Sequence, residues 1–350
     1  MTNGGSDAIE CRFADVDSLE GWEAGRAQST HGDLFCSALL LRAYHRHLFP
    51  LVIVECLRGG RVIGGCWGWD RREGGIRRLQ HPPTLGYGTL WIADADLSPS
   101  RTESLARDVS TALAAFLPRH FDFISVCAAP EFQATAGFQA AGWRVIPEAT
   151  YRFPLGDVED AWERLESSRR RNIKHARKRG YRVTPSEDIG ALDQVMTAML
   201  ERRGAPHPPL RPFLEELVSG LHGLGLGQLF IAQTDAGELA GAKVIVWQGD
   251  RAHDYLGAAQ GDHVLHHVNT LMVWEAIEWL CRRGEHQWFD LYCSGIDEIG
   301  AYKKQFNAPL LNALFFEFTA SARLRFAEHR RGMWDALKRR LRGKRYGTPD

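Results

Sequence analysis

Several signals that would assign a function class directly are missing from this sequence of 350 residues. No apolar run approaches the roughly 20 residues that a membrane span needs. The first residues, MTNGGSDAIECRF, lack the basic and apolar blocks of a secretory signal. The seven cysteines are an odd number and form no CxxC pair, which argues against a disulfide framework or a zinc knuckle. These absences predict a cytoplasmic protein with reduced thiols.

Motifs for hydrolysis, nucleotide binding and metal binding are also missing. The sequence contains neither a G-x-S-x-G elbow nor a P-loop, so hydrolase and nucleotidase functions lack support. His263, His266 and His267 are spaced to cluster on a helix, but only Asp262 lies near them as a further metal ligand. We therefore interpret them as polar loop histidines and expect no metal.

The formal net charge of zero conceals two basic segments. Residues 169–182 hold eight Lys and Arg and no acid, and residues 321–345 hold ten against Glu328 and Asp335. A basic face on an otherwise acidic body favours an anionic partner. Two solvated helices are the alternative explanation, and for the C-terminal segment an anionic membrane surface is a second partner to consider.

The order of predicted elements occurs twice. Residues 51–70 and 229–250 each have the pattern of a β-hairpin, with a Gly-containing turn between apolar strands. The segments that then correspond are helices at 104–117 and 270–281, strands from Phe121 and Phe289, and short helices from Ala136 and Gly300. A helix between strands implies a parallel crossover in a mixed sheet. The sequence therefore predicts a duplicated α/β fold.

The boundary between the two α/β units is expected near residue 152, because Pro154 and Gly156 interrupt the pattern there. We divide the chain into an N-terminal domain of residues 1–152, a C-terminal domain of residues 153–320, and a basic helix or tail of residues 321–350.

Two segments carry a family resemblance. TYRFPLGDVEDAWERLESSRRRNIKHARKRGYRV (150–183) contains a Thr-Tyr strand, an acidic turn and R-x-x-I-x-x-A-x-x-x-G. VWEAIEWLCRRGEHQWFDLYCSGIDEIGAYKKQFN (273–307) contains a helix, a Gly, a Phe-Asp strand, and an aromatic-Lys pair before a Phe. Both resemble the Fem family, whose members have two GNAT acyltransferase units in tandem. The resemblance covers residues 51–318 and implies two GNAT-like domains, each a mixed sheet flanked by helices.

Fem enzymes transfer amino acids from aminoacyl-tRNA to amines of peptidoglycan precursors. The resemblance therefore implies aminoacyl-tRNA as donor and an amine of a peptidoglycan precursor or peptide-like metabolite as acceptor. Tandem-GNAT acetyltransferases share the pattern, so acyl-CoA is the alternative donor. A non-catalytic RNA- or membrane-binding module is the second alternative. Either donor would be a co-substrate, and no other cofactor is expected.

The same resemblance places the catalytic pair on Tyr302 and Lys303. A Lys ammonium at this position would stabilise the tetrahedral oxyanion of acyl transfer. Tyr302 stands where Phe is usual, which leaves both packing and proton transfer as roles for its ring. An exposed helix face is the alternative interpretation of Lys303 and Lys304.

In a usual GNAT domain, a loop of the pattern Q/R-x-x-G-x-G/A at a helix N-terminus binds the CoA pyrophosphate. Residues 258–270 contain Gly261 but no G-x-G, and residues 92–103 contain Asp94 and Asp96, which would repel a pyrophosphate. This pattern favours tRNA phosphates that are bound by Lys and Arg side chains. The expected donor contacts are Arg170, Arg171, Lys174, Arg177, Lys178, Gln260, Asn269 and Lys304.

The resemblance implies that the N-terminal domain, residues 1–152, binds the acceptor and that the C-terminal domain, residues 153–320, carries catalysis and binds the donor. The sequence signal for the acceptor side is the weaker one. Residues 81–91, HPPTLGYGTLW, form an aromatic and Gly-rich loop, and the family places its acceptor pocket near such a loop. We expect Tyr87 and Trp91 to contact the acceptor. A structural turn set by Pro82 and Pro83 is the alternative explanation.

Overall fold

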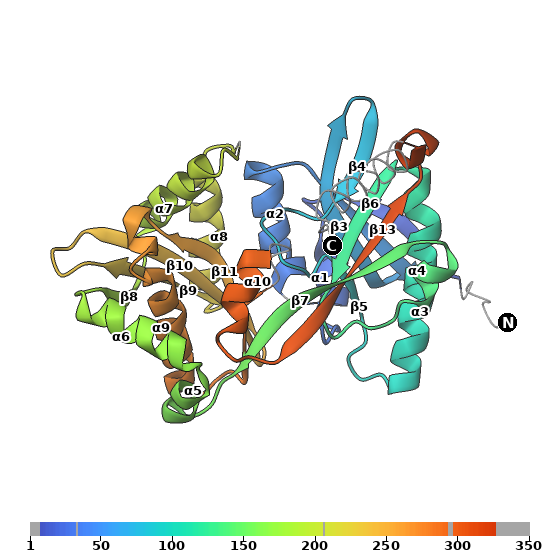
Figure 1. Cartoon of the computed structure of the whole chain (residues 1–350). Helices are drawn as coiled ribbons and strands as arrows, with labels where there is room; N and C mark the ends of the chain where they lie inside the picture. Colours follow the sequence, from blue (N-terminus) through green and yellow to red (C-terminus); the bar gives the residue numbers. More distant parts are fainter. Residues whose placement is uncertain (1–7, 33, 206, 293–296, 327–350) are drawn as a thin grey trace, which may run out of the picture.

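A computed structural model of the chain describes residues 8–32, 34–205, 207–292 and 297–326. Helices flank a mixed sheet whose strands follow the order β1-β2-β3-β4-β6-β13-β7-β12-β11-β10-β9-β8, with β5 beside β3 and β6 (Figure 1). Within the described ranges, no helix is long and apolar enough to cross a membrane.

Among the described residues, the first half of the chain has seven strands and four α-helices. They are β1 (Glu10–Ala14), α1 (Glu20–Arg26), α2 (Ala38–His47), β2 (Leu51–Arg58), β3 (Arg61–Glu73), β4 (Ile76–Gln80), β5 (Leu90–Ile92), α3 (Pro99–Phe116), β6 (Phe123–Ala128), α4 (Ala136–Ala140) and β7 (Arg144–Pro154). Two short 3₁₀ turns, η1 (Leu34–Cys36) and η2 (Leu117–Arg119), complete this half.

In the described part of the second half, six α-helices and six strands follow. They are α5 (Val158–Arg164), α6 (Ser167–Lys178), β8 (Arg182–Ser186), α7 (Ile189–Arg202), α8 (Arg211–Gly223), β9 (Gly227–Gln233), β10 (Leu239–Gln248), β11 (Arg251–Ala259), α9 (Val268–Arg283), β12 (Trp288–Asp290), α10 (Asp297–Lys304) and β13 (Leu310–Thr319). A 3₁₀ turn, η3 (Gly261–Val264), lies between β11 and α9.

The predicted tandem α/β architecture is confirmed. The two hairpins are β2–β3 and β9–β10, and each is followed by the expected helix, strand and short helix: α3, β6 and α4 in the first half, α9, β12 and α10 in the second. In α3, Leu105, Val109 and Leu113 are buried at i, i+4 and i+8, which is the stripe that a helix presents to a sheet. Of the basic C-terminal segment, residues 322–326 are helical, and residues 327–350 lie outside the described part.

The two halves of the chain are joined in one continuous sheet. We call the part with β1 to β7 and β13 the first sheet and the part with β8 to β12 the second sheet, and each pairs with a strand from the other half of the chain. β13, from the end of the chain, lies between β6 and β7, with Leu314 opposite both Ala128 and Pro147. In the other direction, the end of β7 pairs with β12, with Phe153 opposite Phe289. Residue 152 therefore falls inside a strand that both sheets share, and the range 153–320 includes a strand of the first sheet.

Aromatic residues from both halves meet in one buried cluster between the sheets. The Tyr44 hydroxyl of α2 lies 2.8 Å from the Tyr255 hydroxyl of β11, and Phe35 stacks on Tyr292 with ring centroids 4.9 Å apart. This cluster includes buried side chains of α7 and α8 as well. The carboxyl end of β12 thus lies against the first half of the chain.

Candidate functional site

The site is built where two parallel strands stop pairing. β11 pairs with β12 only from Arg251 opposite Trp288 to His253 opposite Asp290. β11 then continues to Ala259, whereas β12 ends at Asp290. Ligands in open α/β sheets collect at the carboxyl ends of such strands. The helices α9 and α10 follow these two strand ends in the chain.

Lys303 of α10 reaches the end of β12. Its Nζ donates to the carbonyl oxygen of Tyr292 at 2.5 Å. Tyr292 has a left-handed backbone with φ of 68°, a conformation that costs a non-glycine residue roughly 1–2 kcal/mol. The ammonium group of Lys303 is therefore held against a carbonyl whose direction depends on a strained residue.

Tyr302, the other member of the predicted pair, packs inside the second half. Its ring lies under the Arg169 guanidinium, 4.4 Å from the ring centroid, and 5.5 Å from the ring centroid of Phe306. Burial raises the pKa of the Tyr302 phenol, so the hydroxyl stays protonated at neutral pH. It can donate a hydrogen bond but does not serve as a base near neutrality.

Arg169 is a buried residue beside Tyr302 that was not among the predicted donor residues. It is 5% exposed and donates to the Thr270 hydroxyl at 3.3 Å and to the Tyr302 carbonyl at 3.2 Å. Among the described residues no carboxylate forms an ion pair with it, and burial lowers its pKa. The spacing of the helix could have predicted its burial, because Arg169 lies on the same face of α6 as the apolar Ile173 and Ala176.

The predicted donor residues of α6 fall into two groups. Arg171, Lys174 and Lys178 are exposed. The other two are neutralised within the protein: Arg170 pairs with Glu163 at 2.6 Å, while Arg177 pairs with Glu275 at 2.8 Å and Glu278 at 3.0 Å, both on α9. The outer face of α6 is thus less basic than its sequence indicates.

The histidines of the loop between β11 and α9 surround a phenol. The Tyr181 hydroxyl lies 2.8 Å from His263 Nδ1 and 2.7 Å from His266 Nδ1. His267 precedes α9 with φ of 64°, and its ring lies 5.8 Å from that of His175 on α6. In the part of the chain that the structure describes, no group of three or more His, Cys, Asp or Glu could hold a metal.

The remaining predicted donor residues border the same loop. Gln260 precedes η3, and Asn269 lies in the first turn of α9, beside Thr270. Lys304 is exposed on α10. Gln260, Asn269 and Arg169 therefore lie near the N-terminus of α9, where the helix dipole favours an anion.

Tyr87 and Trp91 are both fully buried. Trp91 packs edge-to-face on Trp22, with ring centroids 5.0 Å apart, in the core of the first half. Tyr87 donates its hydroxyl to Asp290 Oδ2 at 2.6 Å. Direct contact of either ring with an acceptor would require the loop 81–91 to move.

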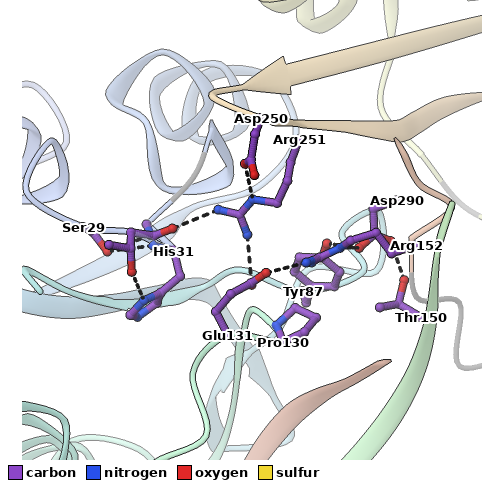
Figure 2. Close-up of polar contacts among 12 residues, drawn as sticks. Ser29, His31, Tyr87, Pro130, Glu131, Thr150, Arg152, Asp250, Arg251 and Asp290 are labelled. Atoms are coloured by element: carbon purple, nitrogen blue, oxygen red, sulfur yellow. Dashed lines mark hydrogen bonds and ion pairs between the residues drawn. The ribbon is translucent and has the colours of Figure 1, made fainter. Parts of the chain in front are cut away.

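Asp290 is the centre of a buried polar network that joins the halves (Figure 2). It is completely buried and accepts from the Thr150 hydroxyl at 2.5 Å and from Arg152 Nε at 3.3 Å. Arg152 also pairs with Glu131 at 2.5 Å, and Arg251 of β11 pairs with the same carboxylate at 2.9 Å. Burial opposes the ionisation of Glu131, but the two arginines outweigh it and lower its pKa.

Comparisons with known proteins agree with this geometry. Residues 167–304 match the family model of the acetyltransferase (GNAT) domain. No curated protein matches the chain by sequence. Among solved structures, FemX is 13% identical with a TM-score of 0.59, covering 87% of this chain and 96% of its own. A tandem GNAT protein from the clavulanic acid biosynthesis pathway is 16% identical with a TM-score of 0.52, covering 89% and 99%.

A third structure extends the comparison. The C-terminal domain of a putative lysylphosphatidylglycerol synthetase from Agrobacterium fabrum is 13% identical with a TM-score of 0.51, covering 87% of this chain and 92% of its own. At these identities the likeness establishes the fold, and the family match assigns residues 167–304 to the acetyltransferase (GNAT) domain. The chain therefore contains a GNAT domain at residues 167–304 and has the fold of the tandem-GNAT proteins to which it is similar.

Proposed function

We propose that this acyltransferase forms an amide by moving an aminoacyl group from aminoacyl-tRNA to an amine. The acceptor is an amine of a peptidoglycan precursor or of a peptide-like metabolite. Its nitrogen attacks the carbonyl carbon of the tRNA ester, the ester C–O bond breaks, and the ribose hydroxyl leaves with the proton. Lys303 stabilises the oxyanion that forms between these two steps. The reaction is placed in the cytoplasm, where aminoacyl-tRNA is made.

The observation that carries the choice of donor is the composition of the surface at the N-terminus of α9. The loop before this helix presents His266 and His267 where a CoA-binding GNAT loop has small residues. The exposed basic side chains of α6 continue this surface, since His175 of α6 lies against His267. Burial and neighbouring positive charges lower the pKa of His266 and His267, so the charge that would bind a polyanion comes from the exposed Arg171, Lys174 and Lys178 of α6.

The buried guanidinium of Arg169 supports the same location for the donor. Burial of a charge without an ionic partner costs free energy. An anion at the first turn of α9 would be an ionic partner for Arg169. The resemblance to the Fem family supports aminoacyl-tRNA as that anion. A lysylphosphatidylglycerol synthetase domain with this fold is consistent with an amino acid as the transferred group.

Acyl-CoA is the second donor that a specific observation favours. The family model that matches residues 167–304 is described as an acetyltransferase domain, and backbone N–H groups at the start of α9 can bind a pyrophosphate without the usual glycines. The two donors share the same chemistry at Lys303. They differ in the leaving group, which is a ribose hydroxyl or a thiol.

One experiment separates the donors. The purified protein is incubated with a set of charged tRNAs or of acyl-CoAs, together with peptidoglycan-precursor peptides and simple amines, and products are detected by mass spectrometry. Amide product that depends on charged tRNA and disappears after ribonuclease treatment supports the proposal. Product formed only from acyl-CoA assigns the alternative donor, and no product from either set contradicts both.

A further inference from the structure

The turn after β12 has a feature that the proposed function does not use. Asp290 Oδ1 accepts a hydrogen bond from the backbone N–H of Tyr292 at 2.7 Å, which closes an Asx turn over two residues. The carbonyl of the same Tyr292 accepts from Lys303 Nζ at 2.5 Å. We propose that Asp290 is a positioning residue for Lys303, which acts through the backbone of Tyr292.

The reason lies in the left-handed backbone of Tyr292. A bulky residue adopts φ of 68° only where surrounding interactions hold it there. The hydrogen bond to Asp290 satisfies the Tyr292 N–H in this conformation. Without it, Tyr292 would relax toward an extended backbone, and its carbonyl would turn away from Lys303.

The carboxylate that makes this turn is itself held rigidly. Tyr87 donates to Oδ2 at 2.6 Å, Thr150 donates to Oδ1 at 2.5 Å, and Arg152 approaches Oδ2 at 3.3 Å. These donors come from the loop before β5 and from β7, so they belong to the first half of the chain, whereas Asp290 belongs to the second (Figure 2). Both carboxylate oxygens are therefore fixed in direction.

The arrangement gives the interface between the halves a role in transfer. Contacts from the first half fix Asp290, Asp290 fixes the Tyr292 carbonyl, and that carbonyl fixes the ammonium of Lys303. Misplacement of a catalytic group by about 1 Å can reduce the rate roughly 10²-fold. The kinetic part of the inference rests on the proposed role of Lys303, and the structural part does not.

The kinetic test compares Asp290→Ala with Asp290→Asn. Asparagine retains an oxygen that accepts from Tyr292 and Thr150, so we expect it to keep most of the turnover, whereas alanine should lower kcat about 10²-fold with little change in either KM. The matched control is Glu55→Ala, which removes another buried carboxylate, paired with Arg12 between β1 and β2. Should Asp290→Ala not fold, Thr150→Val removes one donor to the carboxylate and carries the same test.

A double-mutant cycle shows whether Asp290 acts through Lys303. In a Lys303→Ala background, the additional Asp290→Ala change should alter kcat less than about threefold, because groups that act as a unit are not additive. If the loss of kcat in the double variant equals the product of the two single losses, the proposal is overturned, since Asp290 would then act independently of Lys303.

The second test needs no substrate. Trace labelling with isotopic acetic anhydride, read by mass spectrometry, compares the labelling of Lys303 with that of its exposed neighbour Lys304. We expect the Lys303 to Lys304 ratio to rise several-fold in Asp290→Ala and to stay unchanged in Asp290→Asn and Glu55→Ala. An unchanged ratio in Asp290→Ala overturns the positioning role. A raised ratio together with normal turnover in Lys303→Ala retains the positioning role and rejects the catalytic role proposed for Lys303.

Discussion

The guanidinium of Arg169 lies over the ring of Tyr302, 4.4 Å from its centroid, and donates to the carbonyl of the same residue at 3.2 Å. Arg169 belongs to α6 and Tyr302 to α10, so this side chain joins the two helices. The neighbour of Tyr302 on α10 is Lys303. Arg169 therefore links the basic helix to the residue that we assign to oxyanion stabilisation.

Replacement of Arg169 by lysine tests this link. A lysine keeps the charge but cannot donate to Thr270 and Tyr302 in one planar fork. We expect turnover to fall about tenfold, the equivalent of one charge-assisted hydrogen bond. The control is Arg283→Lys, which changes another arginine stacked on an aromatic ring, at 4.7 Å over Trp279. Equal turnover in Arg169→Lys and the native protein would contradict the link.

Removal of the Lys303 side chain should have the largest effect on chemistry. We expect Lys303→Ala to reduce kcat roughly 10²–10³-fold, the scale for one lost oxyanion stabiliser. Lys303→Arg should restore activity only in part, because a planar head cannot occupy the same point. Lys304→Ala should instead raise the donor KM and leave kcat nearly unchanged. Near-native kcat in Lys303→Ala would show that Lys303 is not catalytic.

The Tyr302 ring is expected to act by packing. Because burial raises the pKa of its phenol, the hydroxyl remains protonated through the neutral range and loses its proton only at more alkaline pH. Tyr302→Phe keeps the ring and should retain activity within about threefold, whereas Tyr302→Leu should lose the stacking with Arg169 and about 1 kcal/mol of stability. The measurement is the pH–rate profile from pH 6 to 10. A loss of its alkaline limb in Tyr302→Phe would assign proton transfer to the hydroxyl.

Charge reversal on α6 tests tRNA as the donor. Arg171, Lys174 and Lys178 are the exposed predicted residues without ion pairs in the described structure. Changing all three to Glu should raise the KM for charged tRNA and leave the acceptor KM nearly alone. The slope of log K against log salt should flatten by about 2, since each neutralised phosphate of a single strand contributes about 0.7.

A matched control for this experiment lies at the opposite end of the molecule. Arg101, Arg107 and Arg119 are exposed on or beside α3, which is far from α6 (Figure 1). Their reversal changes the net charge equally and should leave the KM for tRNA close to its native value. A donor KM that changes neither with salt nor in the α6 triple variant would contradict tRNA as the donor and favour acyl-CoA.

The sequence by itself determined the order of elements in each half. The hairpins, helices and strands were predictable because each has a local signal, such as the spacing of Leu105, Val109 and Leu113 on α3. The position of the aromatic-Lys pair near a strand end was predictable for the same reason. These signals depend on residues close to each other in the sequence, so they can be recognised without knowledge of the fold.

Only the tertiary structure decided which distant residues meet. β13 enters the first sheet beside β6, although about 190 residues separate Phe316 from Val126, and no local pattern encodes such a pairing. Glu275 and Glu278 neutralise Arg177 because α6 packs on α9. Asp290 lies in the strand that the sequence predicts from Phe289, but its partners Tyr87 and Thr150 come from the other half of the chain. A buried carboxylate must find its donors wherever folding brings them, so its role is a property of the folded chain.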